Sequence, residues 1–162
     1  MRYEVSSSAR DTGGLISEQD IEVVRAGYDA LNRRDHEAWI RTLHSDVELH
    51  ELPTSPDAAV FQGHDEVRKW IKSVFEVGAE GSRFEPQHFA EFGPFTLVSV
   101  RALIFARGSA VPVEAPLFHV IEVVDGKARR IWGFLSEAEA RDQIDRLQHE
   151  PQERGPGDVS AK

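Results

Sequence analysis

The first half of the chain carries a helical pattern of apolar residues. Apolar positions recur three or four residues apart at Ile21, Val24, Tyr28 and Leu31, and again over residues 67–74. This spacing places them on one face of an α-helix. A shorter apolar segment follows Asp35, a residue type that caps helix N-termini. The pattern predicts helices at about residues 17–31, 36–43 and 64–77, with one strand at residues 47–52.

From residue 83 onward the period of the pattern changes to two, which is typical of β-strands. Strands are predicted at about residues 83–92, 95–107, 111–124 and 127–135, separated by the turn segments "FGP", "RGSA" and "DG". Ser136 and the acidic residues after it mark the start of a last helix that ends near residue 147. The order ααβαββββα predicts an α+β fold, in which a curved, mostly antiparallel sheet packs against three N-terminal helices.

Length and composition narrow the class of protein. The 162 residues suit one domain, expected at residues 15–148, with polar tails at residues 1–14 and 149–162. The absence of cysteine excludes disulfides, and the seven histidines show no metal-site spacing, so neither a metal nor a cofactor is expected. A net charge of −9 argues against nucleic-acid binding. Because no signal segment or membrane-spanning run is visible, a cytoplasmic location is expected.

His119 interrupts an apolar row in the segment "APLFHVIEVVDGK". Alternate residues of a strand point to the same face. The row that contains the histidine is otherwise apolar: Val123, Ile121, His119, Leu117, Ala115 and Val113. His119 is therefore expected to point into the protein, where it could transfer a proton near neutral pH. The alternative is a core histidine that is hydrogen-bonded to the backbone.

Glu51 is the second candidate for catalysis. In the segment "VELHEL" it continues the apolar row of Val47 and Leu49, so its carboxylate is expected at the inner end of that strand. A buried glutamate must find a partner or accept a raised pKa. The simpler alternative is that the strand ends at His50 and that Glu51 is solvated.

Several aromatic and apolar residues are candidates for a binding pocket. Trp132 and Phe134 share a row of the last strand, and His88 lies in the row Phe84, Pro86, His88, Ala90 and Phe92. Tyr28 and Trp70 lie on the apolar stripes of two helices, and Leu117 shares the row of His119. The same residues could be ordinary core, since aromatic side chains fill both roles.

Three segments resemble the SnoaL-like branch of the NTF2-like superfamily. They are "YDALNRRDHEAWIRTLHSDVELHE", "FQGHDEVRKWI" and "VEAPLFHVIEVVDGKARRIWGF", and the resemblance extends over about residues 16–146. It implies a cone-shaped sheet, an apolar pocket between the sheet and the helices, and a homodimer formed through the outer face of the sheet. The superfamily contains isomerases, cyclases, dehydratases, epoxide hydrolases and non-enzymatic binders, so the fold alone does not define the activity.

The resemblance also bears on individual residues. In the ketosteroid isomerase branch the general base is an aspartate at the end of the first strand, a position that Glu51 occupies here. That branch also uses a tyrosine on the first helix, where the nearest residue here is Gly27, with Tyr28 one position away. Ser136 stands near the position of an acidic residue in polyketide cyclases. These two departures disfavour steroid isomerisation and aldol cyclisation.

Two functions remain open from the sequence. The first is an enzyme that performs acid–base chemistry on a small apolar metabolite without a cofactor, with Glu51 as the base and His119 as the proton donor. Isomerisation, cyclisation, dehydration and epoxide opening all belong to this class. The second is a non-catalytic domain that binds a small molecule in the same pocket or serves dimerisation.

Overall fold

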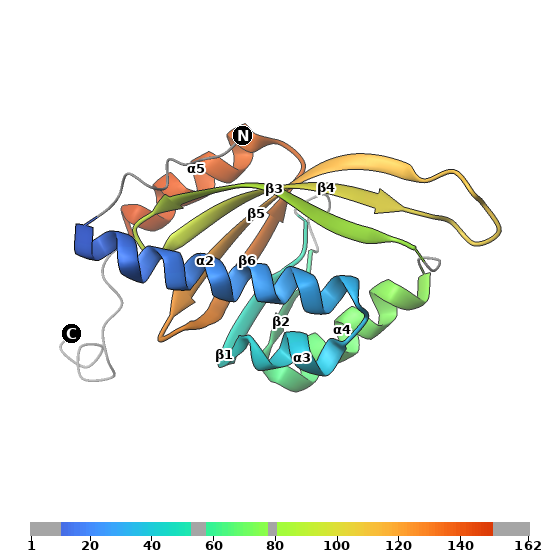
Figure 1. The fold of residues 1–162 in the computed structure, drawn as a ribbon, viewed down its shortest axis with the longest axis horizontal. Coiled ribbons are helices and arrows are strands. Elements are labelled where there is room, and N and C mark those ends of the chain that lie inside the picture. Colours follow the sequence, from blue (N-terminus) through green and yellow to red (C-terminus); the bar gives the residue numbers. More distant parts are fainter. Residues whose placement is uncertain (1–10, 53–57, 78–80, 151–162) are drawn as a thin grey trace.

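The computed structural model describes residues 11–52, 58–77 and 81–150, with the side chains of residues 11–17 and 77 excluded. Within these residues, helices lie on both faces of a single curved sheet (Figure 1). The helices are α2 (Asp11–Asn32), α3 (His36–Arg41), α4 (Gly63–Val77) and α5 (Glu137–Gln148). The strands are β1 (Leu43–His50), β2 (Val60–Gln62), β3 (Arg83–Phe92), β4 (Phe95–Ile104), β5 (Val113–Val124) and β6 (Lys127–Phe134).

The sheet is mixed, and its strand order is β2-β1-β6-β5-β4-β3. All neighbouring pairs are antiparallel except β1 and β6, which run parallel and bring the first strand against the last. The predicted α+β class, with three helices before the main part of the sheet, is confirmed. The short strand β2 was not predicted, because three residues are too few to show a period.

Several element boundaries differ from the prediction. Helix α2 begins at Asp11, within the segment expected to be an N-terminal tail. Strand β1 begins at Leu43, where the prediction still placed a helix. The two predicted caps are present: Asp35 accepts a hydrogen bond from the Ala38 N–H at 3.0 Å, and Ser136 accepts one from the Glu139 N–H at 3.2 Å. The C-terminal tail beyond residue 150 lies outside the described residues.

The two faces of the sheet carry separate apolar clusters. The inner face packs against α2, α3 and α4, and its cluster includes Val47, Leu49, Val98 and Ile121. The outer face packs against α5, and its cluster contains Phe95, Leu97, Val120, Trp132, Phe134, Ala140, Ile144 and Leu147. Helix α5 therefore covers part of the outer face, through which the resemblance implied a homodimer.

A bulge in β3 changes which side chains face inward. The pairing of β3 with β4 shifts between Pro86 and His88, so Gln87 has no single partner. Such an extra residue reverses the alternation after it. Phe84 lies on the inner side of the bulged strand and Phe89 is buried in the inner cluster, whereas His88 is exposed.

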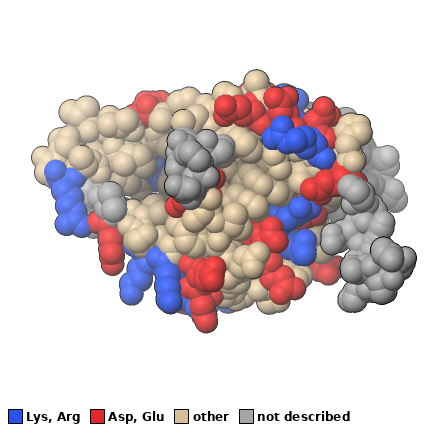
Figure 2. Space-filling view, turned by 180° about the vertical axis from the view of Figure 1, so that it is seen from behind, with Lys and Arg blue, Asp and Glu red and all other residues tan. Residues whose placement is uncertain are grey.

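Charged side chains cover the surface in mixed clusters. Figure 2 shows Lys and Arg side chains beside Asp and Glu side chains near the edges of one face, and no continuous basic surface on that face. Among the described residues, no helix combines the length and the hydropathy needed to cross a bilayer.

Candidate functional site

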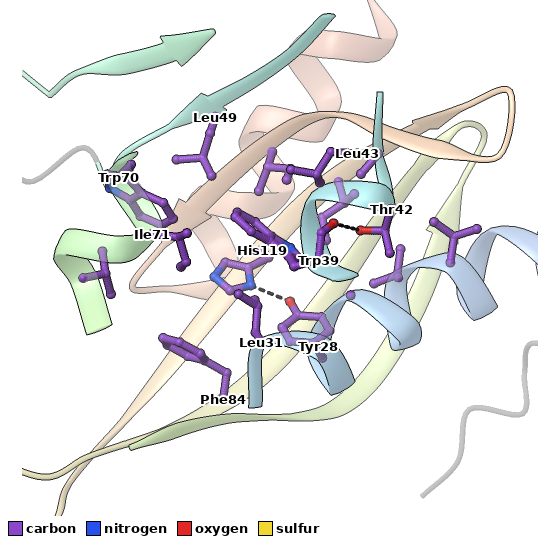
Figure 3. Close-up of a pocket in the computed structure, with 17 residues that line it drawn as sticks. Tyr28, Leu31, Trp39, Thr42, Leu43, Leu49, Trp70, Ile71, Phe84 and His119 are labelled. Atoms are coloured by element: carbon purple, nitrogen blue, oxygen red, sulfur yellow. Dashed lines mark hydrogen bonds between the residues drawn. The ribbon is translucent and has the colours of Figure 1, made fainter. Parts of the chain in front are cut away.

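An apolar cavity lies between the inner face of the sheet and the N-terminal helices (Figure 3). Its volume is about 100 Å³. Helices α2, α3 and α4 and strands β1, β3, β5 and β6 all contribute to its wall. The lining residues are Val23, Val24, Gly27, Tyr28, Leu31, Trp39, Thr42, Leu43, Leu49, Trp70, Ile71, Val74, Phe84, His119, Ile121, Ala128 and Ile131.

Tyr28 and His119 form the main polar contact on this wall. The Tyr28 hydroxyl on α2 lies 2.5 Å from Nδ1 of His119 on β5, and the two rings are nearly parallel, with centroids 5.8 Å apart. The other ring nitrogen, Nε2, points away from Tyr28 (Figure 3). No described residue forms a hydrogen bond with Nε2, so this nitrogen is available to a bound molecule.

Burial fixes the protonation of this pair. It lowers the pKa of His119 from 6.5 to about 4, and it raises the pKa of the Tyr28 phenol above its usual value. Both groups are therefore uncharged at neutral pH. The phenol has no other hydrogen-bond partner among the described residues, so we assign its O–H as the donor to Nδ1, which places the hydrogen of the neutral imidazole on Nε2. His119 consequently presents an N–H donor rather than a base.

Gly133 leaves room for the imidazole. It is the direct partner of His119 in the β5–β6 pair, so its missing side chain would lie on the same face. A Cβ atom at this position would lie 3.5 Å from Cδ2 of His119 and 3.2 Å from Cδ2 of Leu52. The glycine thus lets the histidine ring and the leucine pack over the end of β6.

Glu51 lies just outside the cavity. Its Oε2 accepts a hydrogen bond from Nε1 of Trp70 at 3.3 Å, and its Oε1 accepts one from the backbone N–H of Ala59 at 3.2 Å. Trp70 lines the cavity and Glu51 does not, so the indole separates the carboxylate from the cavity. Glu51 instead borders an outer groove of about 420 Å³ between α5 and the β1–β2 edge of the sheet. The structure does not bring Glu51 and His119 together.

Three other candidates lie away from the cavity. Trp132 and Phe134 point to the outer face, where they pack against α5 and line the outer groove. Trp132 also stacks on His50, with ring centroids 5.0 Å apart. His88 is exposed on the outer side of the β3 bulge. The expectation that these side chains share a pocket with His119 is wrong, because the opposite row of β6 faces inward and the bulge turns His88 outward.

The remaining candidates lie on the inner side. Tyr28 and Trp70 line the cavity with His119. Leu117 packs against the inner cluster without reaching the cavity wall. Sequence reasoning missed Trp39 and Phe84, two aromatic residues of the wall. Phe84 lies in the same sequence row as the pocket candidate His88, so the alternation of this strand was a usable signal for it.

Among the described residues, no group of three or more His, Asp or Glu side chains is arranged to hold an ion. The polar side-chain groups of the wall are the Tyr28–His119 pair, the Thr42 hydroxyl and the Trp39 N–H, since the Trp70 N–H already donates to Glu51. The arrangement can therefore bind a largely apolar molecule and donate a hydrogen bond to an acceptor atom that this molecule carries.

The fold and the cavity are those of a small α+β protein with an apolar pocket between a curved sheet and its N-terminal helices. Residues 24–131 match the model of the SnoaL-like domain. Because the match covers more than half of the chain, the protein belongs to the SnoaL-like domain family. No curated protein sequence matches the chain significantly.

Solved structures agree with this fold. An NTF2-like protein of unknown function from Burkholderia pseudomallei K96243 is 26% identical, with a TM-score of 0.63 over 78% of this chain and 97% of that one. TerC, co-crystallised with polyporic acid, is 24% identical, with a TM-score of 0.63 over 78% and 98% of the two chains. A Mycobacterium tuberculosis LEH-like epoxide hydrolase is 16% identical, with a TM-score of 0.61 over 80% and 91%. The last two likenesses concern the fold alone.

Proposed function

We propose that the protein is an acid–base enzyme that acts on a small, largely apolar metabolite bound in the inner cavity. The observation that carries the proposal is the Tyr28–His119 pair on an otherwise apolar wall. Isomerisation, cyclisation, dehydration next to a carbonyl and epoxide opening all develop negative charge on a substrate oxygen. A hydrogen-bond donor that already points at this oxygen stabilises the transition state more than the bound substrate.

His119 is the proposed donor. Tyr28 holds the ring orientation and the tautomer, so that Nε2–H faces the bound molecule without prior rearrangement. Removing one such donor from an enzyme typically costs about 3 kcal/mol of transition-state stabilisation, a rate factor of about a hundred or more. Full proton transfer from a neutral imidazole would leave a buried anion, so the proposed role is hydrogen-bond donation to the developing oxyanion.

The proposed proton acceptor is Glu51. Its carboxylate is in hydrogen-bond contact with Trp70, a residue of the cavity wall. It would reach a bound substrate only if the Trp70 side chain turned away. The resemblance to the ketosteroid isomerase branch, in which a carboxylate at the end of this strand is the base, supports the assignment of Glu51.

The second candidate function is binding without catalysis. It is favoured by one observation: among the described residues, no carboxylate lines the cavity. Binding without catalysis requires the apolar wall and the hydrogen-bond donor, but it does not require Glu51. The two functions therefore make different predictions for the same variants.

Deuterium exchange separates enolate-forming catalysis from binding before the natural substrate is known. Small ketones in D₂O exchange the protons next to their carbonyl when an enzyme forms the enolate, and proton NMR detects the loss of signal. We expect the wild-type protein to accelerate this exchange, His119→Leu and Glu51→Gln to abolish it, and His119→Gln, which keeps an N–H donor, to retain part of it.

Ketone binding without accelerated exchange would contradict the enolate-forming reactions and favour the binding function over them. Accelerated exchange that survives in Glu51→Gln would remove Glu51 from the mechanism while leaving His119 in place. Circular dichroism of each variant excludes loss of the fold as the cause.

A further inference from the structure

We propose that the inner cavity selects an uncharged molecule of about one ring that carries a hydrogen-bond-accepting oxygen, and that it rejects anions of the same size. This inference rests on the cavity assigned under the proposed function, and it specifies the class of ligand. It concerns binding and does not require that the protein catalyses a reaction.

The size of the cavity limits the ligand. An apolar cavity of about 150 Å³ in another protein is sufficient to hold benzene. The volume here, about 100 Å³, is of the same order. Trp39, Trp70 and Phe84 supply aromatic surfaces around it, which suit a flat ring. A ligand of four fused rings would not fit unless the helices moved.

The charge of the wall limits the ligand as well. None of the lining residues is a lysine, an arginine, an aspartate or a glutamate. The only titratable groups that face the cavity from the described helices and strands are Tyr28 and His119 themselves, and both are uncharged at neutral pH. An anion in this cavity would lose its hydration without gaining a counter-charge.

The polar groups of the wall select an acceptor. The hydrogen on Nε2 of His119 has no partner among the described residues. Trp39 has its Nε1 near Gly27, 3.7 Å from the position that a Cβ atom would take there, and this N–H also forms no hydrogen bond within the described residues. The Thr42 hydroxyl already donates to the backbone oxygen of Trp39 at 2.7 Å. A carbonyl, ether or epoxide oxygen would satisfy these donors.

Three probes of nearly equal size test the selection. Acetophenone carries a ring and one carbonyl oxygen, ethylbenzene carries the ring without an acceptor, and benzenesulfonate carries the ring with a permanent negative charge. Dissociation constants are measured by ligand-observed NMR at pH 7. We expect acetophenone to bind about two- to tenfold more tightly than ethylbenzene, the value of one net hydrogen bond. We expect benzenesulfonate to bind at least about a hundredfold more weakly than acetophenone.

Two variants assign the preference to the proposed donor. In His119→Leu the advantage of acetophenone over ethylbenzene should disappear, while ethylbenzene itself still binds. Tyr28→Phe keeps the shape of the wall but removes the hydroxyl that holds the hydrogen of His119 on Nε2. The preference for acetophenone over ethylbenzene should therefore become smaller. If His119→Leu does not fold, the Tyr28→Phe variant and the three wild-type constants still decide the question.

The outcomes separate this inference from the proposed function. Binding of benzenesulfonate within tenfold of acetophenone, or no preference of the wild type for acetophenone over ethylbenzene, would overturn the ligand class. Deuterium exchange at the acetophenone methyl group, followed in the same samples, reports on catalysis. Selective binding without accelerated exchange would support the ligand class and contradict enolate-forming catalysis. Accelerated exchange with unselective binding would support catalysis and contradict the ligand class.

Discussion

Replacing His119 by glutamine should remove a specific part of the acid sensitivity of the protein. In the unfolded chain a histidine has a pKa near 6.5, whereas burial lowers the pKa of His119 to about 4. The unfolded state therefore binds a proton over a range of pH in which the folded state does not. The stability contributed by the neutral histidine is fully present above about pH 6.5 and is lost as the pH falls toward 4.

The size of the effect follows from the two pKa values. One pH unit of difference corresponds to about 1.4 kcal/mol. The interval between 6.5 and about 4 therefore corresponds to a loss of about 3 kcal/mol in the free energy of unfolding. Below pH 4 both states are protonated, and this contribution stops changing. Tyr28 does not titrate in this interval because burial raises the pKa of its phenol further.

Urea denaturation at pH 7, 6, 5 and 4.5, followed by tryptophan fluorescence, measures the effect. Other groups titrate in the same range, so the informative quantity is the difference between wild-type and His119→Gln stabilities at each pH. This difference should shift by about 2–3 kcal/mol in favour of the variant between pH 7 and pH 4.5. Parallel pH curves for the two proteins would show that His119 is not buried as a neutral group. The assignment of its hydrogen to Nε2 would then be wrong as well.

Three further predictions concern the elements that surround the cavity. Asn32→Ala removes two hydrogen bonds that join α2 to the backbone of Phe84, at 2.7 and 2.9 Å. It should lower the free energy of unfolding by about 1–3 kcal/mol in urea melts, and an unchanged value would show that these hydrogen bonds do not hold β3 in place. Ile144→Ala empties a buried position under α5 and should cost about 2–5 kcal/mol in the same assay, whereas a cost below about 1 kcal/mol would mean that α5 is not firmly packed. Arg101→Ala breaks an exposed ion pair with Glu114 and should leave the thermal midpoint unchanged, and a clear decrease would indicate that this face is covered in solution.

Much of the fold could be predicted from local pattern. Strands β3 and β4 begin at residues 83 and 95, as the period-two pattern predicts, and α4 contains the apolar stripe that includes Trp70. Asp35 and Ser136 cap helices because their side chains accept a hydrogen bond from a backbone N–H three residues further on. The inward direction of His119 also followed from its row on β5. These features depend on neighbours in the sequence, which a single chain displays directly.

The composition of the site required the tertiary structure. Alternation divides a strand into two rows, but it does not say which row faces inward when both rows are apolar. This ambiguity applied to β6, where α5 covers the row of Trp132 and Phe134, Ile131 lines the cavity and Gly133 lies beside the ring of His119. In β3 a single extra residue at the bulge moved His88 to the opposite face.

The properties of His119 likewise depend partly on the local sequence and partly on the tertiary structure. Its sequence neighbours determined that an imidazole would lie among hydrocarbons. Only the packing of α2 against β5 placed the Tyr28 hydroxyl on Nδ1, and only the position of α4 placed the Trp70 indole between Glu51 and the cavity. Such contacts join residues that are far apart in the chain, 91 positions in the case of Tyr28 and His119. Their geometry depends on how helices and sheet pack, which local periodicity does not specify.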